Sequence, residues 1–243
     1  MENIVVLNVN FNFGYGEDTI YPVILQDEDE MILVDCGYTN FLSLLEKAAY
    51  EKGIDLSKLT KVIVTHHDYD HMGSLAAIKK KYPHIKIIAS EKDAPYVTGR
   101  KKSLRLEQAE QIQLTMPQEQ QEAGKVFQDI LKSVENTEVD MTVKDGDYVS
   151  CCGGIEIMET PGHMPGHISL YLKKLKVLIS GDALAIENGN LQIAAPQYTL
   201  DMAEAKKSVL KLLNYDIEKI ICYHGGEYQG NIPAALQNID KMS

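Results

Sequence analysis

Histidine and aspartate side chains gather in four short segments of this 243-residue sequence, each directly after an apolar run. The first segment holds His66, Asp68, Asp70 and His71; the others hold His163 with His167, Asp182, and His224. Imidazole and carboxylate groups suit zinc, iron or manganese, and short turns after rigid strands hold such ligands in place. A single histidine is more often a core residue with one hydrogen bond, but four repeats of this placement favour a metal site.

Short runs rich in Val and Ile predict that strands position these segments. Residues 4–10, 19–26 and 31–34 read as a β-meander, and a helix is predicted over 40–52. The buried strand predicted at 61–64 ends at the first polar segment. A helix over 73–81 and a strand over 85–89 would complete a β-α-β unit.

A second β-rich half follows a segment of different character. Residues 93–140 are rich in Gln, Glu and Lys and show helical spacing, which predicts a helical insertion over the active site; an ordinary connecting helix pair is the alternative. Strands are predicted at 147–149, 154–159, 168–172 and 176–180, then a helix over 201–213 and a strand over 217–223. Two similar halves predict one domain over residues 1–243, an α/β fold in four αββα layers.

Composition excludes several classes of protein. The chain has 24 Lys and Arg against 35 Asp and Glu, a net charge of −11, which argues against nucleic-acid binding. No apolar stretch is long enough for a membrane helix, and the N-terminus lacks a secretory signal. Four cysteines in such a chain are expected to be free thiols. We therefore expect a cytoplasmic protein with a small-molecule substrate and no nucleic-acid or membrane partner; monomer and dimer stay equally open.

Five motifs occur in a characteristic order along the chain. They are Val34-Asp35-Cys36-Gly37, His66-His67-Asp68-Tyr69-Asp70-His71, Thr160-Pro161-Gly162-His163, Ser180-Gly181-Asp182 and Tyr223-His224-Gly225. This set resembles the metallo-β-lactamase-fold hydrolases, which include glyoxalase II, lactonases and zinc β-lactamases. The resemblance spans about residues 4–226, with separations of 92, 19 and 42 residues between His71, His163, Asp182 and His224. It implies the four-layer sandwich of that type, with two mixed sheets between helices.

The resemblance also implies roles for the metal-binding residues. His66 and His163 would bind a first metal ion, Asp70, His71 and His224 a second, and Asp182 both. Two divalent ions, expected to be zinc, would hold a bridging hydroxide that attacks a carbonyl, with Asp70 orienting it as a catalytic residue.

Two further residues are implied to support these ligands. Asp35 and His167 would hold a ligand or its loop, although a purely structural role is supported equally well.

Asp68 departs from the family pattern, in which a second histidine stands at this position. Either Asp68 or the adjacent His67 could supply the ligand; the match at Asp70 and His71 fixes the register and favours Asp68. Flavodiiron proteins of this fold place Glu there, so a carboxylate is chemically tolerated. With three carboxylates and one hydroxide around two divalent ions the centre would be neutral rather than +1, which predicts more tolerance of Mn or Fe.

The bond that is cleaved is less well determined than the metal site. Lactonases of this superfamily place a tyrosine where this chain has Ala185, although Tyr69, Tyr198, Tyr223 or Tyr228 could replace it. Glyoxalase II carries a C-terminal extension for which residues 227–243 are too few. A hydrolase of an ester, lactone, thioester or similar bond is predicted. An iron-dependent redox enzyme, flavodiiron- or persulfide-dioxygenase-like, and a non-catalytic metal-binding protein stay as alternatives.

Overall fold

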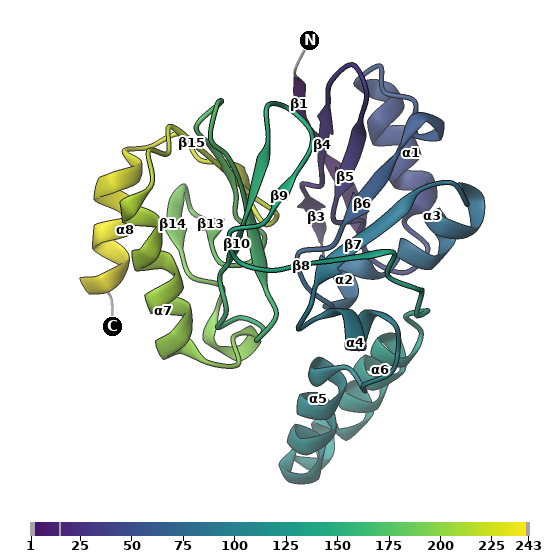
Figure 1. The fold of residues 1–243 in the computed structure, drawn as a ribbon. Helices are drawn as coiled ribbons and strands as arrows, with labels where there is room; N and C mark the ends of the chain where they lie inside the picture. Colours follow the sequence, from purple (N-terminus) through teal and green to yellow (C-terminus); the bar gives the residue numbers. More distant parts are fainter. Residues whose placement is uncertain (1–2, 15, 242–243) are drawn as a thin grey trace.

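The computed structural model describes residues 3–14 and 16–241, and two six-stranded sheets dominate it (Figure 1). The first sheet has the order β1 (Asn3–Val6), β4 (Val23–Gln26), β5 (Met31–Val34), β6 (Lys61–Ile63), β7 (Lys86–Ser90) and β8 (Met141–Val143). Its first three strands are antiparallel and β5 to β8 are parallel.

The second sheet has the order β16 (Gly226–Glu227), β15 (Lys219–Cys222), β12 (Val177–Ile179), β11 (Ile168–Leu172), β10 (Ile155–Glu159) and β9 (Tyr148–Val149). Only β12 and β15 pair in parallel, and the other neighbours are antiparallel. Both sheets are therefore mixed, as predicted.

Helices cover the outer faces of the two sheets (Figure 1). Helices α1 (Leu42–Glu51) and α3 (Leu75–Lys81) cover the first sheet, and α7 (Met202–Lys211) and α8 (Ile232–Lys241) cover the second. Between the sheets, Ile32 and Ile63 belong to the same fully buried cluster as Ile157 and Leu170. Burying each such side chain contributes about 1.5–3 kcal/mol. The predicted four-layer αββα sandwich is confirmed.

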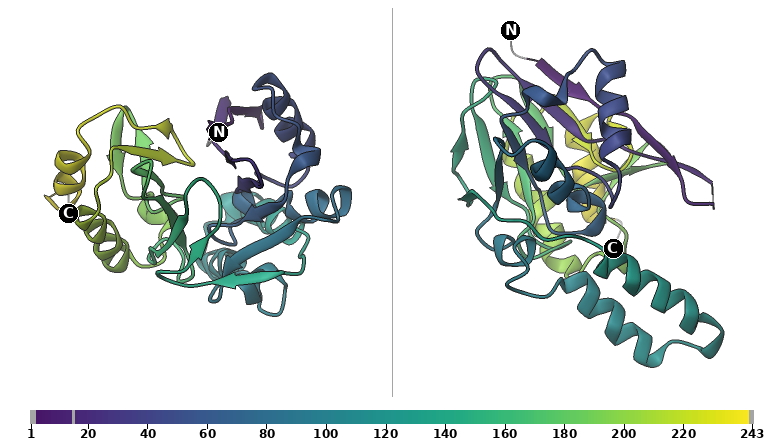
Figure 2. Two further views of the ribbon diagram at one scale, coloured as in Figure 1. Left: turned by 45° about the horizontal axis from the view of Figure 1, so that its top comes forward. Right: turned by 90° about the vertical axis from the view of Figure 1, so that its right-hand side faces the viewer.

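The predicted helical insertion is a pair of antiparallel helices, α5 (Leu104–Thr115) and α6 (Gln121–Lys132), joined through the 3-10 helix η2 (Gln118–Gln120). Two short helices, α2 (Tyr69–Met72) and α4 (Ala94–Val97), lie near its base. The pair projects from the sandwich, and only its base adjoins the sheets (Figure 2). The single-domain assignment, with this insertion over the active site, stays a prediction.

The N-terminal meander is interrupted. Residues 4–10 belong to two strands, β1 and β2 (Val9–Asn12), and residues 19–26 belong to β3 (Glu17–Ile20) and β4. Strands β2 and β3 form a separate hairpin. Pro22 ends the pairing of β3 because proline has no backbone N–H to donate to a ladder, while its carbonyl accepts from Leu7. The alternation of apolar and polar residues does not reveal that the neighbouring strand changes partway along the segment.

The remaining elements are short. A hairpin of β13 (Ala185–Glu187) and β14 (Asn190–Gln192) leads to the 3-10 helix η3 (Pro196–Tyr198), and η1 (Leu56–Lys58) and η4 (Leu212–Asn214) are single turns. Within the described part of the chain, no helix has the length and apolar character needed to cross a membrane.

Candidate metal centre

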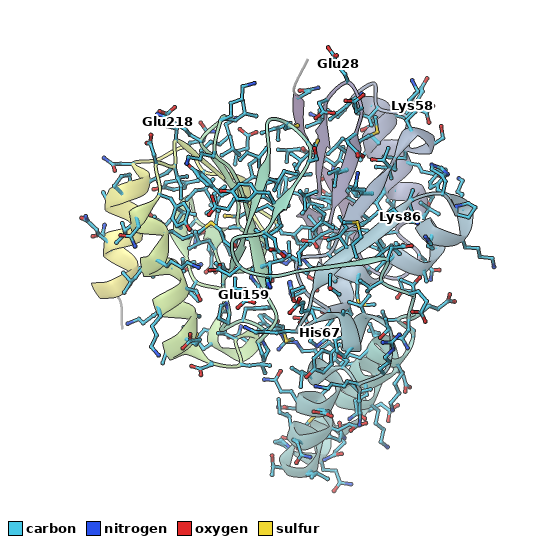
Figure 3. All side chains as sticks on the ribbon, viewed as in Figure 1. Glu28, Lys58, His67, Lys86, Glu159 and Glu218 are labelled. Carbon is cyan, nitrogen blue, oxygen red and sulfur yellow. The ribbon has the colours of Figure 1, made fainter. Side chains whose placement is uncertain are left out.

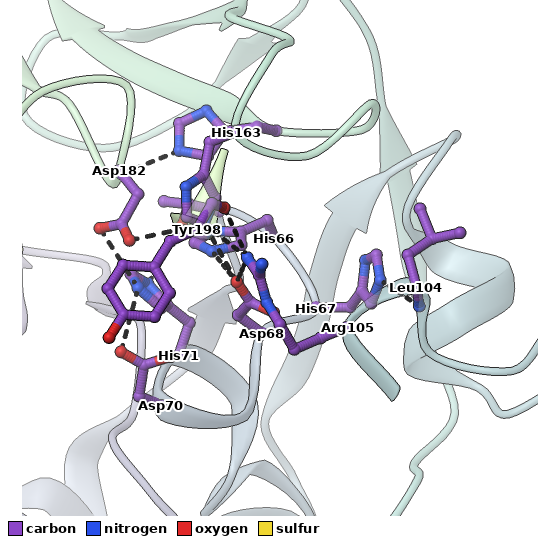
Figure 4. Close-up of polar contacts among 12 residues, drawn as sticks. His66, His67, Asp68, Asp70, His71, Leu104, Arg105, His163, Asp182 and Tyr198 are labelled. Atoms are coloured by element: carbon purple, nitrogen blue, oxygen red, sulfur yellow. Dashed lines mark hydrogen bonds and ion pairs between the residues drawn. The ribbon is translucent and has the colours of Figure 1, made fainter. Parts of the chain in front are cut away.

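The four polar segments meet at one edge of the sandwich, because each follows a strand that ends there. His66 and Asp68 follow β6, and the next two candidates, Asp70 and His71, lie in α2. The other three are His163 after β10, Asp182 after β12 and His224 after β15. All seven are packed into one cluster, with six of them buried and His224 partly exposed. Figure 4 shows the six buried side chains. The first sheet supplies four of these side chains and the second supplies three.

One part of the cluster contains His66, Asp68 and His163. Asp68 Oδ2 lies 3.0 Å from His163 Nε2 and 3.5 Å from His66 Nε2. Ligand atoms about 2.0–2.2 Å from a tetrahedral ion lie about 3.3–3.6 Å apart. The two distances from Asp68 Oδ2 are close to this spacing, and the ligand atoms of the three residues all lie within 4.8 Å of one another, so they could share one ion.

The other part contains Asp70, His71 and His224. Asp70 Oδ2 lies 3.2 Å from His224 Nε2 and 3.8 Å from His71 Nε2. Asp182 reaches both parts, since its Oδ1 is 3.3 Å from His71 Nε2 and its Oδ2 is 3.6 Å from Nε2 of both His163 and His224. This is the position that a bridging carboxylate would need.

Three ligand atoms in the cluster are buried without a hydrogen-bond partner: His66 Nε2, His71 Nε2 and Asp182 Oδ1. A buried polar atom left unpaired costs about 1–3 kcal/mol, so such atoms usually have a partner. Two nitrogen lone pairs and a carboxylate oxygen at the centre of one cluster are the donor set that suits a divalent cation. The residues present therefore fit metal ions.

Electrostatics keep His66 and Asp68 in the protonation states that metal binding needs, whereas for His71 and His224 burial alone would lower the pKa but the nearby Asp182 raises it. Burial, together with the nearby His71, holds the pKa of His66 well below its ordinary value. Burial alone would raise the pKa of Asp68, but contacts with His163 and other neighbours hold it well below its usual range. A neutral imidazole beside an ionised carboxylate is ready to bind a cation without first losing a proton.

Asp35 connects ligands of both parts of the cluster. Its Oδ1 accepts from the backbone N–H of Thr65, and its Oδ2 accepts from Thr65 Oγ1 at 2.8 Å and from His71 Nδ1 at 2.9 Å. Thr65 Oγ1 in turn accepts from His66 Nδ1 at 3.0 Å. These bonds place the proton of each ring on Nδ1 and leave the Nε2 lone pair for a metal ion.

His167 lies behind Asp182. Its Nδ1 donates to Thr160 Oγ1 at 2.8 Å, and its Nε2 accepts the backbone N–H of Asp182 at 2.9 Å. Burial lowers the pKa of His167 to about 3, so the ring stays neutral as this pair of bonds requires. Gly181 fits here because a Cβ would lie 2.7 Å from His167 Nε2 and its φ is +52°.

His67, the alternative to Asp68, points away from the cluster (Figure 4). Its Nδ1 donates to Asp93 Oδ2 at 2.9 Å, and its Nε2 accepts the N–H of Leu104 at 3.3 Å. Figure 3 places it where the helical pair joins the sandwich. His67 thus holds the start of α5, and Asp68 is the residue that faces the candidate ligands.

Sequence reasoning missed Arg105, in the first turn of α5. This buried guanidinium contacts Asp68 through two nitrogens. Only two of the 24 basic residues are arginine, Arg100 and Arg105. That rarity is the one signal that could have drawn attention to it, because helical spacing alone does not distinguish a buried from an exposed position on α5.

A cavity of about 480 Å³ opens onto the cluster. Its walls include Tyr69 and Tyr198, whereas Tyr223 donates its hydroxyl to the Asp70 carbonyl and accepts from Gly37 N–H. Tyr228 lines a different cavity. Of the four tyrosines considered for substrate contact, two line the candidate site.

Known proteins resemble this chain in sequence. The family model described as the metallo-beta-lactamase superfamily matches residues 15–224. The probable metallo-hydrolase YflN of Bacillus subtilis is 24% identical over 221 residues, which cover 85% of this chain and 80% of that protein. A hydroxyacylglutathione hydrolase of Rhodopseudomonas palustris is 29% identical over 129 residues, covering 52% of this chain and 34% of that protein.

Solved structures share the fold at low identity. A metallo-beta-lactamase family protein from Thermus thermophilus superposes with a TM-score of 0.76 at 20% identity, covering 98% of this chain and 78% of that one. An archaeal superfamily protein from Sulfolobus tokodaii gives 0.67 at 18% identity, covering 100% of this chain and 86% of that one. Because the family model matches most of the chain in sequence, the chain belongs to the metallo-beta-lactamase superfamily.

Proposed function

We propose that the protein is a metal-dependent hydrolase that holds two divalent ions, zinc by preference, and cleaves a small-molecule ester, lactone or thioester. The observation that carries the proposal is the group of buried atoms without a hydrogen-bond partner among the described residues, His66 Nε2, His71 Nε2 and Asp182 Oδ1, of which Asp182 also lines a cavity. His66, Asp68 and His163 would hold one ion; Asp70, His71 and His224 would hold the other; Asp182 would contact both. Bound there, divalent ions supply acidified water and polarise a carbonyl.

The protein's own side chains have separate tasks around that centre. Asp70 lines the cavity, where its carboxylate can accept a hydrogen bond from the attacking water. The hydroxyls of Tyr69 and Tyr198, which line the cavity together with Ala185, can contact a substrate oxygen. Arg105 is engaged with Asp68, so its charge is already compensated.

The cavity wall supports a substrate without negative charge. Beyond the candidate ligands, its charged lining residues are Asp18, Glu187 and the paired Arg105, and the described lining holds no lysine. Ile186 and Ile193 add apolar surface. An anionic group in this wall would meet carboxylates rather than a free cation, which costs binding free energy.

The test begins with metal analysis of protein purified without chelator. About two equivalents of zinc per chain would justify assays with 4-nitrophenyl esters, lactones and thioesters. A His66→Ala variant, which removes a ligand, should lose the turnover that the parent shows. Less than a tenth of an equivalent, with no uptake on adding zinc or manganese, would contradict the proposal, and bound iron would favour the redox alternative.

A further inference from the structure

Asp68 stands where the family has a second histidine, and Arg105 binds its carboxylate. Arg105 Nε donates to Asp68 Oδ1 at 3.1 Å, and Arg105 Nη2 donates to Asp68 Oδ2 at 2.6 Å. Both residues are buried, with 3% of Arg105 and 4% of Asp68 exposed. A bidentate guanidinium–carboxylate pair fixes the plane of the carboxylate as well as its charge.

Further bonds fix the guanidinium itself. Nη2 also donates to the Tyr198 carbonyl at 2.7 Å, and Nη1 donates to Gln108 Oε1 at 2.6 Å. The guanidinium group is therefore hydrogen-bonded to α5, to η3 and to Asp68. A lysine could supply the charge but not this set of directed donors.

One oxygen of Asp68 faces the other candidate ligands of the first metal position. Oδ2 has two lone pairs: Arg105 uses one, and the other points to the histidines, with His163 Nε2 hydrogen-bonded at 3.0 Å and His66 Nε2 at 3.5 Å, contacts that a bound ion would replace. Arg105 Nη2 lies farther from His163 Nε2, at 3.5 Å, and His66 Nε2 has no partner. The guanidinium thus lies beside the space between these ligands and does not fill it.

We propose that Asp68 and Arg105 form one unit, neutral overall, that takes the place of a histidine at the first metal position. Asp68 Oδ2 is the ligand atom, and Arg105 is a positioning residue that orients the carboxylate and cancels its charge. With Arg105 counted, the charge around two divalent ions and one hydroxide returns to +1. The unit also connects the first metal position to α5 and to the cavity wall at Tyr198.

The first experiment measures metal equivalents and affinity by competition with a chromophoric chelator, without any substrate. Arg105→Met should weaken binding of one of the two ions about 10- to 100-fold and leave the other unchanged. Arg105→Lys should restore part of the thermal stability that Arg105→Met loses without restoring the affinity. Arg100→Met is the matched control, because Arg100 is exposed and pairs with the exposed Glu138; it should change neither quantity.

The opposite result has a distinct meaning. If the guanidinium replaced the first ion, the parent would bind one equivalent and Arg105→Met would bind two. That gain, or an affinity unchanged by Arg105→Met, would overturn the proposal while leaving the proposed hydrolase in place.

A swap tests whether the two residues are one unit. Asp68→His alone leaves a buried, unpaired cation beside the new imidazole, so it should bind about one equivalent of zinc and melt below the parent. The double variant that also carries Arg105→Met lacks that cation. It should bind a second equivalent of zinc and regain most of the melting temperature that Asp68→His loses. A double variant no better than Asp68→His on either measure would refute the unit.

Discussion

Asp35 is the residue whose bonds reach ligands on both sides of the candidate metal centre. It binds His71 directly and reaches His66 through Thr65 Oγ1. Its backbone has φ +59°, a left-handed conformation that Asp and Asn tolerate better than other residues with a side chain. An Asp35→Asn substitution therefore changes the hydrogen bonding while sparing the turn.

We predict that Asp35→Asn weakens metal binding about 10- to 100-fold. If the new amide keeps its oxygen on the Thr65 N–H, its NH2 faces His71 Nδ1 and favours the tautomer with the proton on Nε2. That proton blocks the lone pair a metal ion would use. Chelator competition measures the change, and Asp55→Asn, at the exposed N-cap of η1, is the control. Equal affinity of Asp35→Asn and the parent would show that Asp35 only supports the fold.

The seven candidate ligands could be named from the sequence because each follows a predictable strand and a recognisable motif. The structure brings all seven together, while their roles as ligands stay predictions. Arg105 could not be named, because its partner lies 37 residues earlier in another element. The expectation of a neutral centre omitted its charge, so the reason for a preference for Mn or Fe is weaker than the sequence suggested.

At the scale of elements, the β13–β14 hairpin forms a wall of the cavity. Its strands are antiparallel neighbours, and Glu187 and Gln192, both lining the cavity, are hydrogen-bonded to each other. The sequence predicts no strand between residues 181 and 200, because three-residue strands have too little alternation to be recognised.

We predict that Glu187→Lys shifts substrate preference toward anions. Reversing one charge in a partly exposed wall is worth up to about 1 kcal/mol, or about fivefold in relative kcat/KM, expressed mainly in KM. The measurement compares 4-nitrophenyl butyrate with 4-nitrophenyl hemisuccinate, which differ by a terminal carboxylate. Glu187→Gln should give a smaller shift in the same direction. An unchanged ratio in both variants would exclude Glu187 as a determinant of substrate charge.

Asp140 joins the segment before β8 to the first sheet and α3. Its Oδ2 accepts the Ile87 N–H at 2.9 Å and pairs with Lys79 at 3.1 Å, and its Oδ1 lies 3.4 Å from Lys86. Burial alone would raise the pKa of Asp140, but the Ile87 N–H and the two lysines lower it. The ionised carboxylate therefore stabilises the fold above its unfolded pKa, and this contribution is lost as pH falls through the lower, folded value.

We predict that Asp140→Asn lowers the melting temperature by about 1–4 °C at pH 7, since such partly exposed pairs contribute about 0.5–1 kcal/mol. The new amide oxygen can still accept the hydrogen bond from the Ile87 N–H, so the decrease in melting temperature reports the loss of the carboxylate charge. The difference from the parent should begin to shrink as pH falls below about 4, the ordinary pKa of an aspartate, and should be gone below the lower pKa of the folded carboxylate. Thermal melts at several pH values check this; a constant difference would indicate a packing effect.

At the scale of the whole molecule, the fold could be predicted from two similar halves of the chain. In each half, apolar runs that read as strands end in polar segments, which favours two sheets whose polar segments meet at one edge. The interrupted N-terminal strands and the direction in which α5 and α6 project could not be predicted. Both depend on contacts between segments far apart in sequence, such as the bond from Leu7 N–H to the Pro22 carbonyl. Local alternation carries no information on which strand will be the neighbour.

The candidate metal centre spans the two sheets, since four of its candidate ligands follow strands of the first and three follow strands of the second. Without ions, the carboxylates of Asp68, Asp70 and Asp182 lie together with one buried arginine. Ions that bind only the folded protein stabilise it by about 2.7 kcal/mol at a hundredfold excess over Kd. We therefore predict that a chelator lowers the melting temperature by about 5–11 °C.

The stability lost on chelation should first affect the segments around the candidate ligands and only later the whole chain. Hydrogen exchange after chelation should rise first in residues 65–73, 160–168 and 181–183, which carry ligands or the residues behind them, while β5, β6 and residues 169–172 of β11 in the buried core stay protected. Adding zinc back should restore both the protection and the melting temperature. If chelation left the melting temperature unchanged, or raised exchange evenly over the chain, the two sheets would be held together by the apolar core alone, and the cluster would contribute nothing to their association.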